Sequence, residues 1–596
     1  MHESTHSPGH RSESYAAIPL CEPSEVALKS FFLGPQAENA VWLSRTMQEL
    51  LRLWFAWRRE SYPEDGAAIS MQDKSLPSFV CHQDKVRSLA LGLMQRYAAE
   101  VPKFSPRYMG HMFSEISLPA VLGHVISLLH NPNLIASEAA PVGVQIEQEA
   151  IEELLAMVGF TREEGMGHFT SGGTLANDEA LVRARERSAL WMARGLAYGM
   201  KGFAQAAHMG WEAYQTIGLQ AMEADLHCSR ISPWALGSRL RALFQRDYAG
   251  PVLIVPRSKH YSWVKAAHLI GLGEESLWQI PLDASGKISL SALKEALDRA
   301  EAEDRPVLMV VSVAGTTEMG EVDPVHRVQD LLDRRQKERG FHIWHHVDAA
   351  YGGFLRTLGG PSEDGLSPEV WSALEALSRV QSITLDPHKL GYVPYASGTF
   401  LTQKRQDYFV TAHDAPYIQY RSVLDRGRYT LEGSRPAGGA TATWLTARSI
   451  GLHEQGYGWI LQRTVRMRRD LEAKLMASGL PIQLAPGADT NILCFHMAKP
   501  GDLLSHSNAK TQALFEAFRS FEKPPFFVSK TILHKDDYDL YLESFAERWQ
   551  ARVDAPEMVL IRLCLMNPFF ASREMKVDFF AEFVTFLKAH LRADLV

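Results

Sequence analysis

The chain is poor in cysteine and has no excess of basic residues. Its five cysteines among 596 residues are Cys21, Cys81, Cys228, Cys494 and Cys564. No two of them form a Cys-x-x-Cys pair, so we expect neither a zinc module nor a disulfide scaffold, and scattered thiols fit a cytoplasmic protein. The formal net charge is −7, which leaves no basic footprint for nucleic acid. No apolar run approaches the length needed to span a bilayer, so we expect no membrane partner.

The remaining composition is that of a large globular protein. Hydrophobic residues make up 46% of the chain and charged residues 22%, which suits an extensive buried core. The start of the chain lacks the apolar centre of a signal peptide, and we predict a disordered tail over residues 1–23. Residues 24–118 are predicted to be largely helical. Within them, Ala40–Arg58 carries apolar residues at helical spacing. This helix either packs on its own domain or forms an arm around a partner subunit.

From residue 119 the pattern changes to helices that alternate with short apolar strands. The expected strands are Pro251–Val255, Pro306–Val313, His342–Ala349, Gln381–Leu385 and Gly398–Thr402. The alternation predicts a mostly parallel sheet with helices on both faces, in a large domain over residues 119–435. One expected helix, 324–338, ends at Gly340, a plausible C-cap. Residues 188–246 are interpreted as a mainly helical structural insertion.

Residues 436–596 are predicted to form a smaller α+β domain. Its expected strands are Thr490–His496 and Met558–Leu565, and its expected last helix is Val577–Leu591. No internal repeat and no low-complexity block interrupts either domain.

Two short runs carry the strongest chemical signal, and each ends an expected strand. His-Val-Asp-Ala-Ala-Tyr contains Asp348, and Asp-Pro-His-Lys ends at Lys389. A lysine that forms a Schiff base and a carboxylate that pairs with a pyridine nitrogen are what a pyridoxal phosphate (PLP) enzyme needs most. Ala350 is small enough to lie under a ring, and His346 shares the strand face of Asp348 and could orient it. A metal site at this strand is disfavoured because adjacent histidines point to opposite faces.

Other candidate residues follow neighbouring strands. Gly172, Gly173 and Thr174 lead directly into a helix, where backbone N–H groups can approach a phosphate. An ordinary glycine turn would look the same, so this motif gains weight only beside Asp348 and Lys389. His260 follows the Pro251–Val255 strand, a position that suits a ring stacked on PLP. Thr316, after Pro306–Val313, either orients His260 or the cofactor or only forms a turn.

In this order, the motifs resemble those of group II PLP-dependent amino acid decarboxylases. The matching runs are Gly-Gly-Thr, Lys-His-Tyr-Ser-Trp, Gly-Thr-Thr, Val-Asp-Ala-Ala-Tyr, Asp-Pro-His-Lys and Gly-Ser-Arg at 433–435, and they cover residues 105–570. The chain is most similar to the bacterial tyrosine decarboxylase branch, although that branch usually has Met at the position of Leu390. An aromatic L-amino acid is therefore the expected substrate, with Tyr108, Phe113 and Tyr392 as candidates for its pocket.

The resemblance implies a PLP fold type I, aspartate-aminotransferase-like architecture. Its large domain has a mostly parallel seven-stranded sheet and is followed by a small C-terminal domain. The resemblance also implies an obligate homodimer with active sites at the subunit interface. His260 and His388 would lie at the cofactor, and Ser434 would contribute to its binding.

A mobile loop, expected at 407–428, would supply the tyrosine that returns a proton to Cα. Tyr417 is the first candidate, Tyr420 the second, and His388 the alternative donor. Two other activities stay open, a retro-aldol carbon–carbon lyase and an aldehyde synthase. A catalytically inactive scaffold without PLP is a third alternative.

Overall fold

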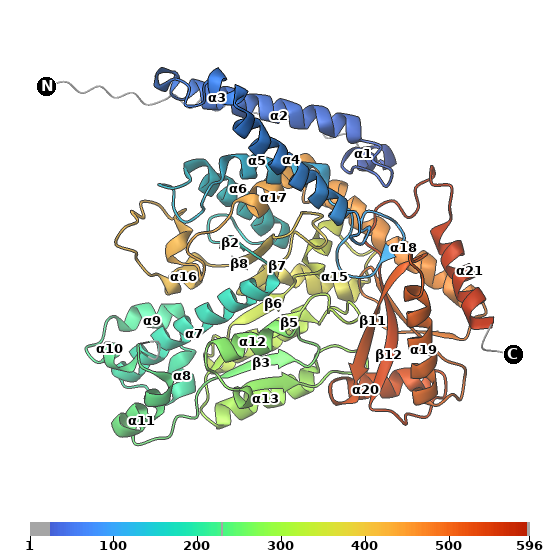
Figure 1. Cartoon of the computed structure of the whole chain (residues 1–596). Helices are drawn as coiled ribbons and strands as arrows, with labels where there is room; N and C mark the ends of the chain where they lie inside the picture. Colours follow the sequence, from blue (N-terminus) through green and yellow to red (C-terminus); the bar gives the residue numbers. More distant parts are fainter. Residues whose placement is uncertain (1–23, 228–229, 593–596) are drawn as a thin grey trace.

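A seven-stranded sheet forms the centre of the large domain (Figure 1). The computed structural model describes residues 24–227 and 230–592, so the predicted tail 1–23 lies outside the described residues. The strands are β2 (Met166–Thr170), β3 (Val252–Pro256), β4 (Leu277–Ile280), β5 (Val307–Val313), β6 (His345–Asp348), β7 (Ser382–Leu385) and β8 (Gly398–Thr402). Their order is β2-β8-β7-β6-β5-β3-β4. Only β8 runs antiparallel to its neighbours, which confirms the expected mostly parallel sheet.

Helices cover both faces of this sheet because its inner strands are apolar on both sides. Leu253 and Val255 of β3 pack in one cluster with α7 (Gly173–Tyr198) and α12 (Ser262–Leu269). Val252 and Ile254 pack on the opposite face with α13 (Leu290–Ala302) and α14 (Val325–Arg339). As expected, α14 ends at Gly340, whose φ of 70° is the left-handed conformation of a glycine C-cap.

The small domain is built on a second, five-stranded sheet of order β1-β11-β12-β10-β9. Its strands are β1 (Tyr108–Met109), β9 (Ile482–Leu484), β10 (Ile492–Met497), β11 (Phe527–His534) and β12 (Glu557–Cys564). Its helices are α18 (Trp459–Ala477), α19 (Leu504–Arg519), α20 (Lys535–Glu547) and α21 (Phe579–Arg592). The edge strand β1 comes from the N-terminal segment and pairs in parallel with β11. This pairing ties the end of the N-terminal segment to the C-terminal sheet.

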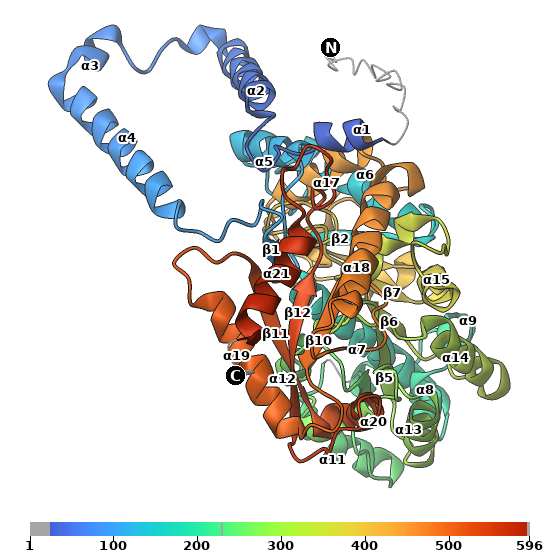
Figure 2. The same cartoon turned by 90° about the vertical axis from the view of Figure 1, so that its right-hand side faces the viewer.

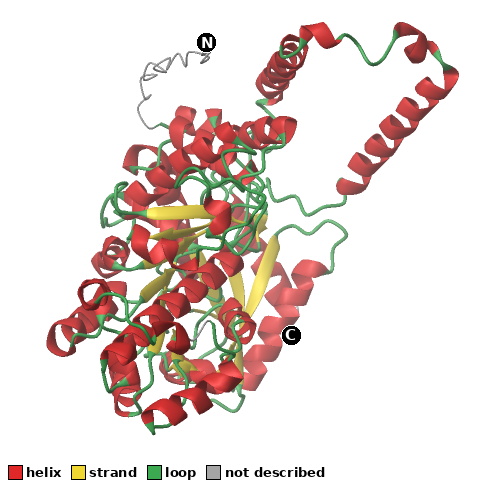
Figure 3. Cartoon of the chain, turned by 90° about the vertical axis from the view of Figure 1, so that its left-hand side faces the viewer, coloured by secondary structure: helices red, strands yellow, loops and turns green. Residues whose placement is uncertain are grey.

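Part of the N-terminal segment projects away from the body as a hairpin of helices, which we call the arm (Figures 2 and 3). The arm consists of α2 (Ala40–Glu60), α3 (Met71–Ser75) and α4 (Pro77–Tyr97), which follow α1 (Glu25–Ser30). None of the residues of α2, α3 or α4 is buried. Behind the arm, α5 (Leu118–His130) and α6 (Pro141–Val158) pack on α17 (Gly438–Ser449).

The insertion at 188–246 is helical, as predicted, and has a small core of its own. It contains the end of α7 together with α8 (Phe203–Ala207), α9 (Gly210–Ile217), α10 (Glu223–Leu226) and α11 (Pro233–Phe244). Met192, Phe203 and Leu240 are buried together in it. Among the helices of the described ranges, none is both long and apolar enough to cross a membrane.

Candidate active site

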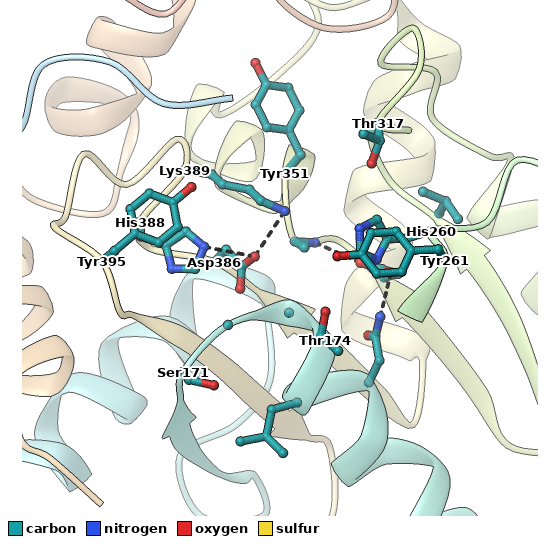
Figure 4. A pocket seen from close by; sticks show the side chains of 18 of the residues that line it. Ser171, Thr174, His260, Tyr261, Thr317, Tyr351, Asp386, His388, Lys389 and Tyr395 are labelled. Atoms are coloured by element: carbon teal, nitrogen blue, oxygen red, sulfur yellow. Dashed lines mark hydrogen bonds and ion pairs between the residues drawn. The ribbon is translucent and has the colours of Figure 1, made fainter. Parts of the chain in front are cut away.

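A pocket of about 370 Å³ lies where β5, β6 and β7 end and α7 begins (Figure 4). This is the edge at which parallel sheets of this kind bind their ligands. Most of the predicted site residues line it: Gly172, Gly173, Thr174, His260, Asp348, Ala350, His388 and Lys389. Motifs that lie far apart in the chain are therefore neighbours in space.

Lys389 reaches into the pocket from the loop after β7 and is held there by Asp386. Its ammonium nitrogen Nζ lies 3.1 Å from Oδ2 of Asp386. The same oxygen lies 3.4 Å from Nε2 of His388. Asp386 is buried, which opposes ionisation, but the charges of Lys389 and His388 bring its pKa below the usual value. The lysine amine is thus positioned by a buried carboxylate to which the sequence motifs assign no role.

Asp348 ends β6 and presents its carboxylate to the pocket. Three N–H donors orient it: the Asn177 amide at 2.8 Å, the Trp263 indole at 3.3 Å and the Ala350 backbone at 3.3 Å. His346, which we expected to be able to orient Asp348, contacts two of its donors. Its ring bonds to Ser382 at 2.7 Å and to the Asn177 side-chain oxygen at 3.3 Å, and it packs edge-on against Trp263 at 5.3 Å.

The turn from β2 into α7 leaves its backbone open to the pocket. Gly172 precedes α7, and no side chain caps the first turn of the helix. A Cβ atom on Gly173 would lie 3.0 Å from Asp386 and 3.1 Å from Ala350, so a side chain there would crowd both walls. Figure 4 shows Ser171 and Thr174 flanking this turn. Free N–H groups at a helix start form a ready site for an anionic group.

His260 lines the pocket on the side of β3, with Nδ1 at 2.9 Å from the Ser262 hydroxyl. Burial lowers its pKa, which favours a neutral ring. Thr317, not Thr316, lines the pocket. Thr316 donates its hydroxyl to the buried carboxylate of Glu321 and does not face the pocket.

Three other predicted residues lie outside the pocket of their own chain. Tyr417 is 82% exposed, in the irregular segment between α16 (Arg405–Tyr408) and the short turn Arg426–Arg428. Tyr420 is on the same segment, with Arg428 over its ring. Ser434 is exposed, and its hydroxyl accepts a 2.9 Å hydrogen bond from Asn133. None of the three lines the pocket.

Aromatic rings border the pocket beside Lys389. Tyr395 lines it and stacks on His388, with ring centroids 4.0 Å apart. Phe113 meets Tyr395 edge-on at 6.3 Å, and Tyr108 stacks on Phe113 at 5.4 Å. Tyr392 differs from our expectation. It is buried behind the pocket and donates a hydrogen bond to the Met566 carbonyl, so it is not a lining residue.

The residues present fit PLP. An amine, a carboxylate oriented by N–H groups and an anion-binding turn face one cavity, as the cofactor's aldehyde, ring nitrogen and phosphate require. Two buried polar atoms at this site, Ser258 Oγ and Asp386 Oδ1, have no hydrogen-bond partner in the described part of the chain. Buried polar groups without partners are rare in proteins, so these atoms are available to a polar ligand.

Comparison with known proteins agrees with this geometry. Residues 244–498 match the model of the pyridoxal-dependent decarboxylase conserved domain. An L-tyrosine decarboxylase of Levilactobacillus brevis is 28% identical over 96% of both chains. A Methanopyrus kandleri protein described as a probable L-tyrosine/L-aspartate decarboxylase is 31% identical, over 47% of this chain and 68% of its own.

Among solved structures, Oryza sativa TDC with PLP and tryptamine shares the fold. Its TM-score is 0.62 at 16% identity, with 94% of this chain and 98% of that chain covered. This agrees with the aspartate-aminotransferase-like fold expected above, and the residues matched by the family model include both Asp348 and Lys389. The chain belongs to the pyridoxal-dependent decarboxylase family, and it is a PLP-dependent enzyme that decarboxylates an amino acid.

Proposed function

We propose that the substrate is an aromatic L-amino acid of the tyrosine type, which the enzyme converts to its amine and carbon dioxide. The full-length similarity to an L-tyrosine decarboxylase carries this proposal. The rings of Tyr108, Phe113 and Tyr395 beside Lys389 support it, because aromatic pairs add attraction beyond the burial of apolar area.

We assign the roles of the site residues as follows. When bound, PLP supplies an electron sink for the bond between Cα and the carboxylate. Asp348 holds the ring nitrogen as a charged pair, and Asn177 and Trp263 keep its carboxylate in place. Lys389 carries the cofactor before the substrate binds and releases the product afterwards. The turn at Gly172, Gly173 and Thr174 binds the phosphate.

His260 and Ala350, which line the pocket, would hold the cofactor ring between them when PLP is bound. His388 shapes the lysine side of the site, and Thr317 takes the place that was expected for Thr316.

We assign the proton returned to Cα to Tyr417, with Tyr420 and then His388 as alternatives. Tyr417 is far more exposed than a proton donor can be during the reaction, so its segment must close over a site. Because Tyr417 and Ser434 do not line the pocket of their own chain, we propose that they serve the site of a partner subunit.

A homodimer follows from this assignment and from the arm. The arm exposes apolar side chains that a monomer would leave in water, among them Trp42, Phe55, Leu89 and Leu93. Exposed apolar surface of this kind indicates a protein partner. Among the cysteines that the structure describes, Cys494 and Cys564 are buried and free, which suits the reducing cytoplasm in which we expect this dimer to work.

A substrate screen tests the proposed activity. The purified holoenzyme is incubated with L-tyrosine, DOPA, phenylalanine, tryptophan, aspartate, glutamate and 2,4-diaminobutyrate, and carbon dioxide and amine are measured. We expect the highest kcat/KM for tyrosine or DOPA. A preference for aspartate, glutamate or diaminobutyrate would contradict the aromatic assignment.

A further inference from the structure

The loop after β7 contains a buried acid that the proposed function does not use. Asp386 is 1% exposed, and one carboxylate oxygen lies 3.1 Å from the ammonium nitrogen of Lys389. The other oxygen has no partner among the described residues. Lys389 and His388 therefore both interact with the same carboxylate oxygen of Asp386, Oδ2.

The carboxylate of Asp386 lies against the phosphate-binding turn. A Cβ atom built on Gly173 would lie 3.0 Å from Oδ2 and 3.4 Å from Oδ1, and one built on Gly398, at the start of β8, would lie 2.8 Å from Oδ1. Asp386 thus lies between the lysine that carries the cofactor and the backbone that we assign to its phosphate. An ionised carboxylate beside a phosphate is unfavourable, since two anions close together raise the pKa of the weaker acid.

Few other charged groups act on Asp386. Lys389, His388 and Tyr395 face it from its own loop, and His260 interacts with it from the loop after β3. Asp348 is the other carboxylate of the pocket, at the end of β6. The N-terminal turn of α7 and the start of β8 approach Asp386 with Gly173 and Gly398. Of the groups named here, Lys389 lies nearest to the carboxylate, at 3.1 Å.

We propose that Asp386 takes the proton of Lys389 when the cofactor is attached, and keeps it while the cofactor is bound. The ammonium of Lys389 gives one proton to the Asp386 carboxylate and becomes a neutral amine. The amine nitrogen then forms a C=N bond with the aldehyde carbon of PLP, and the aldehyde oxygen leaves as water. The neutral Asp386 no longer repels the phosphate. This inference rests on the proposed role of Lys389.

Proton release on cofactor binding tests the proposal. PLP is titrated into the cofactor-free full chain by calorimetry, in buffers of different ionisation enthalpy at pH 7. In Asp386→Asn the lysine proton must go to solvent, so we expect about one more proton released per PLP than in the wild type. Because the variant releases a proton when PLP binds, its PLP affinity relative to the wild type should rise about tenfold for each pH unit. This holds as long as Lys389 is protonated in the cofactor-free chain.

The matched control is Asp330→Asn, which removes an exposed carboxylate paired with Arg379. It should behave as the wild type.

A second measurement does not require cofactor binding. In the cofactor-free chain, the rate of amine acylation at Lys389 is followed by peptide mass spectrometry over a pH series. Without its counter-ion, the ammonium of Lys389 loses its proton more easily in Asp386→Asn, and acylation at neutral pH should become about tenfold faster or more. Equal proton release or unchanged Lys389 reactivity in the variant would overturn the proposal. Borohydride trapping of PLP on the wild type reports separately whether Lys389 is the attachment site.

Discussion

At the scale of single residues, the site depends on side chains that support the reactive groups. Asp348 illustrates this, because its donors Asn177 and Trp263 lie on helices α7 and α12. A buried carboxylate costs several kcal/mol unless donors or a counter-charge compensate for it. The three donors orient Asp348 toward the pocket, and the protonated ring nitrogen would supply the charge.

Replacement of Asp348 by Asn keeps the shape of the side chain and removes its charge. We expect kcat to fall by roughly 10²–10³, the cost typical of a lost electrostatic contact in the transition state. Steady-state decarboxylation measures this. Asp330→Asn serves again as a control for the change of side chain, and a rate within about twofold of the wild type in Asp348→Asn would exclude the proposed role.

Replacement of Lys389 by Ala removes the amine that the pocket presents. We expect turnover to fall below detection and no PLP to be trapped on the protein by borohydride. Lys265, which lies over the ring of Tyr261 beside the pocket, offers the matched Lys→Ala control. Covalent PLP in Lys389→Ala would mean that another lysine carries the cofactor.

Residue types and strand ends were enough to predict most of the pocket lining, but not which atoms meet. Lys389 and Asp348 were predictable because each follows an apolar strand. Asn177 was not, because an asparagine inside a helix resembles a solvent-facing residue until α7 is packed against β6. Thr316 and Thr317 could not be ranked either, since only the path of the backbone decides which hydroxyl meets Glu321.

At the scale of elements, the segment that carries Tyr417 is firmly held at one end. Asp425 is buried and accepts hydrogen bonds from the backbone N–H groups of Ser137, Arg421 and Ser422. These bonds oppose the cost of burial and keep the pKa of Asp425 below its usual value. Nearer the tip, the Gln419 N–H donates to the exposed carboxylate of Glu138 at 3.2 Å, and Tyr417 itself projects into solvent, which suits a lid with a fixed base.

Replacement of Tyr417 by Phe should separate loss of carbon dioxide from protonation. We expect PLP to stay bound and carbon dioxide to be released, while return of the proton to Cα becomes slow enough for oxygen to react. Product analysis in air would then show aldehyde, ammonia and hydrogen peroxide in place of amine. Tyr420→Phe is the matched variant, and aldehyde from it alone would transfer the role to Tyr420.

The segment Ala314–Asp323 contains a carboxylic acid whose ionisation opposes folding. Glu321 is buried, and burial raises its pKa well above the usual value, so it is protonated in the folded state over a wider pH range than in the unfolded state. Stability from this group is present at low pH and is lost as pH rises through the folded pKa. Glu321→Gln should therefore raise the free energy of unfolding at pH 8 by about 1–3 kcal/mol. Denaturant unfolding at pH 8 and pH 5 tests this, and the gain should shrink at pH 5.

The expected strands vary in how well their patterns reveal them. β8 was predicted with the observed bounds, and β3, β5 and β7 within about one residue. The predicted strand His342–Ala349 is shortened to β6, because the ladder to β5 covers only His345–Asp348 and the ladder to β7 only His346–Asp348. β2 was missed since Gly167 and His168 interrupt its apolar run, although both are covered inside the sheet. In the small domain, β11 was also missed. Polar residues interrupt its apolar ones and most of its side chains are half-exposed, so its sequence contains no long apolar run.

At the scale of the whole molecule, the arm connects oligomerisation with activity. The proposed dimer should have about twice the mass of the 66.7 kDa chain.

Leu89 and Leu93 lie one turn apart on α4 and are 65% and 51% exposed. Replacing both with Glu should shift the molar mass measured by light scattering toward that of the monomer and reduce activity in parallel. Gln83→Glu, which adds charge at an exposed position of the same helix, should not. A wild type that is monomeric at micromolar concentration would refute the dimer.

The pairing of β1 with β11 determines the order in which the molecule can be completed. The two strands lie some 419 residues apart in the sequence. The same separation divides Ser529 from Gly110, whose carbonyl accepts a hydrogen bond from the Ser529 hydroxyl beside this pairing. At roughly 5–20 residues per second, the ribosome delivers β11 about 20–80 s after β1. During that time the edge strand has no partner, and the apolar arm beside it is already outside the ribosome. The segment that carries β1 is thus stabilised by its sheet partner only after β11 has been made, and until then its exposed apolar side chains are open to chaperones.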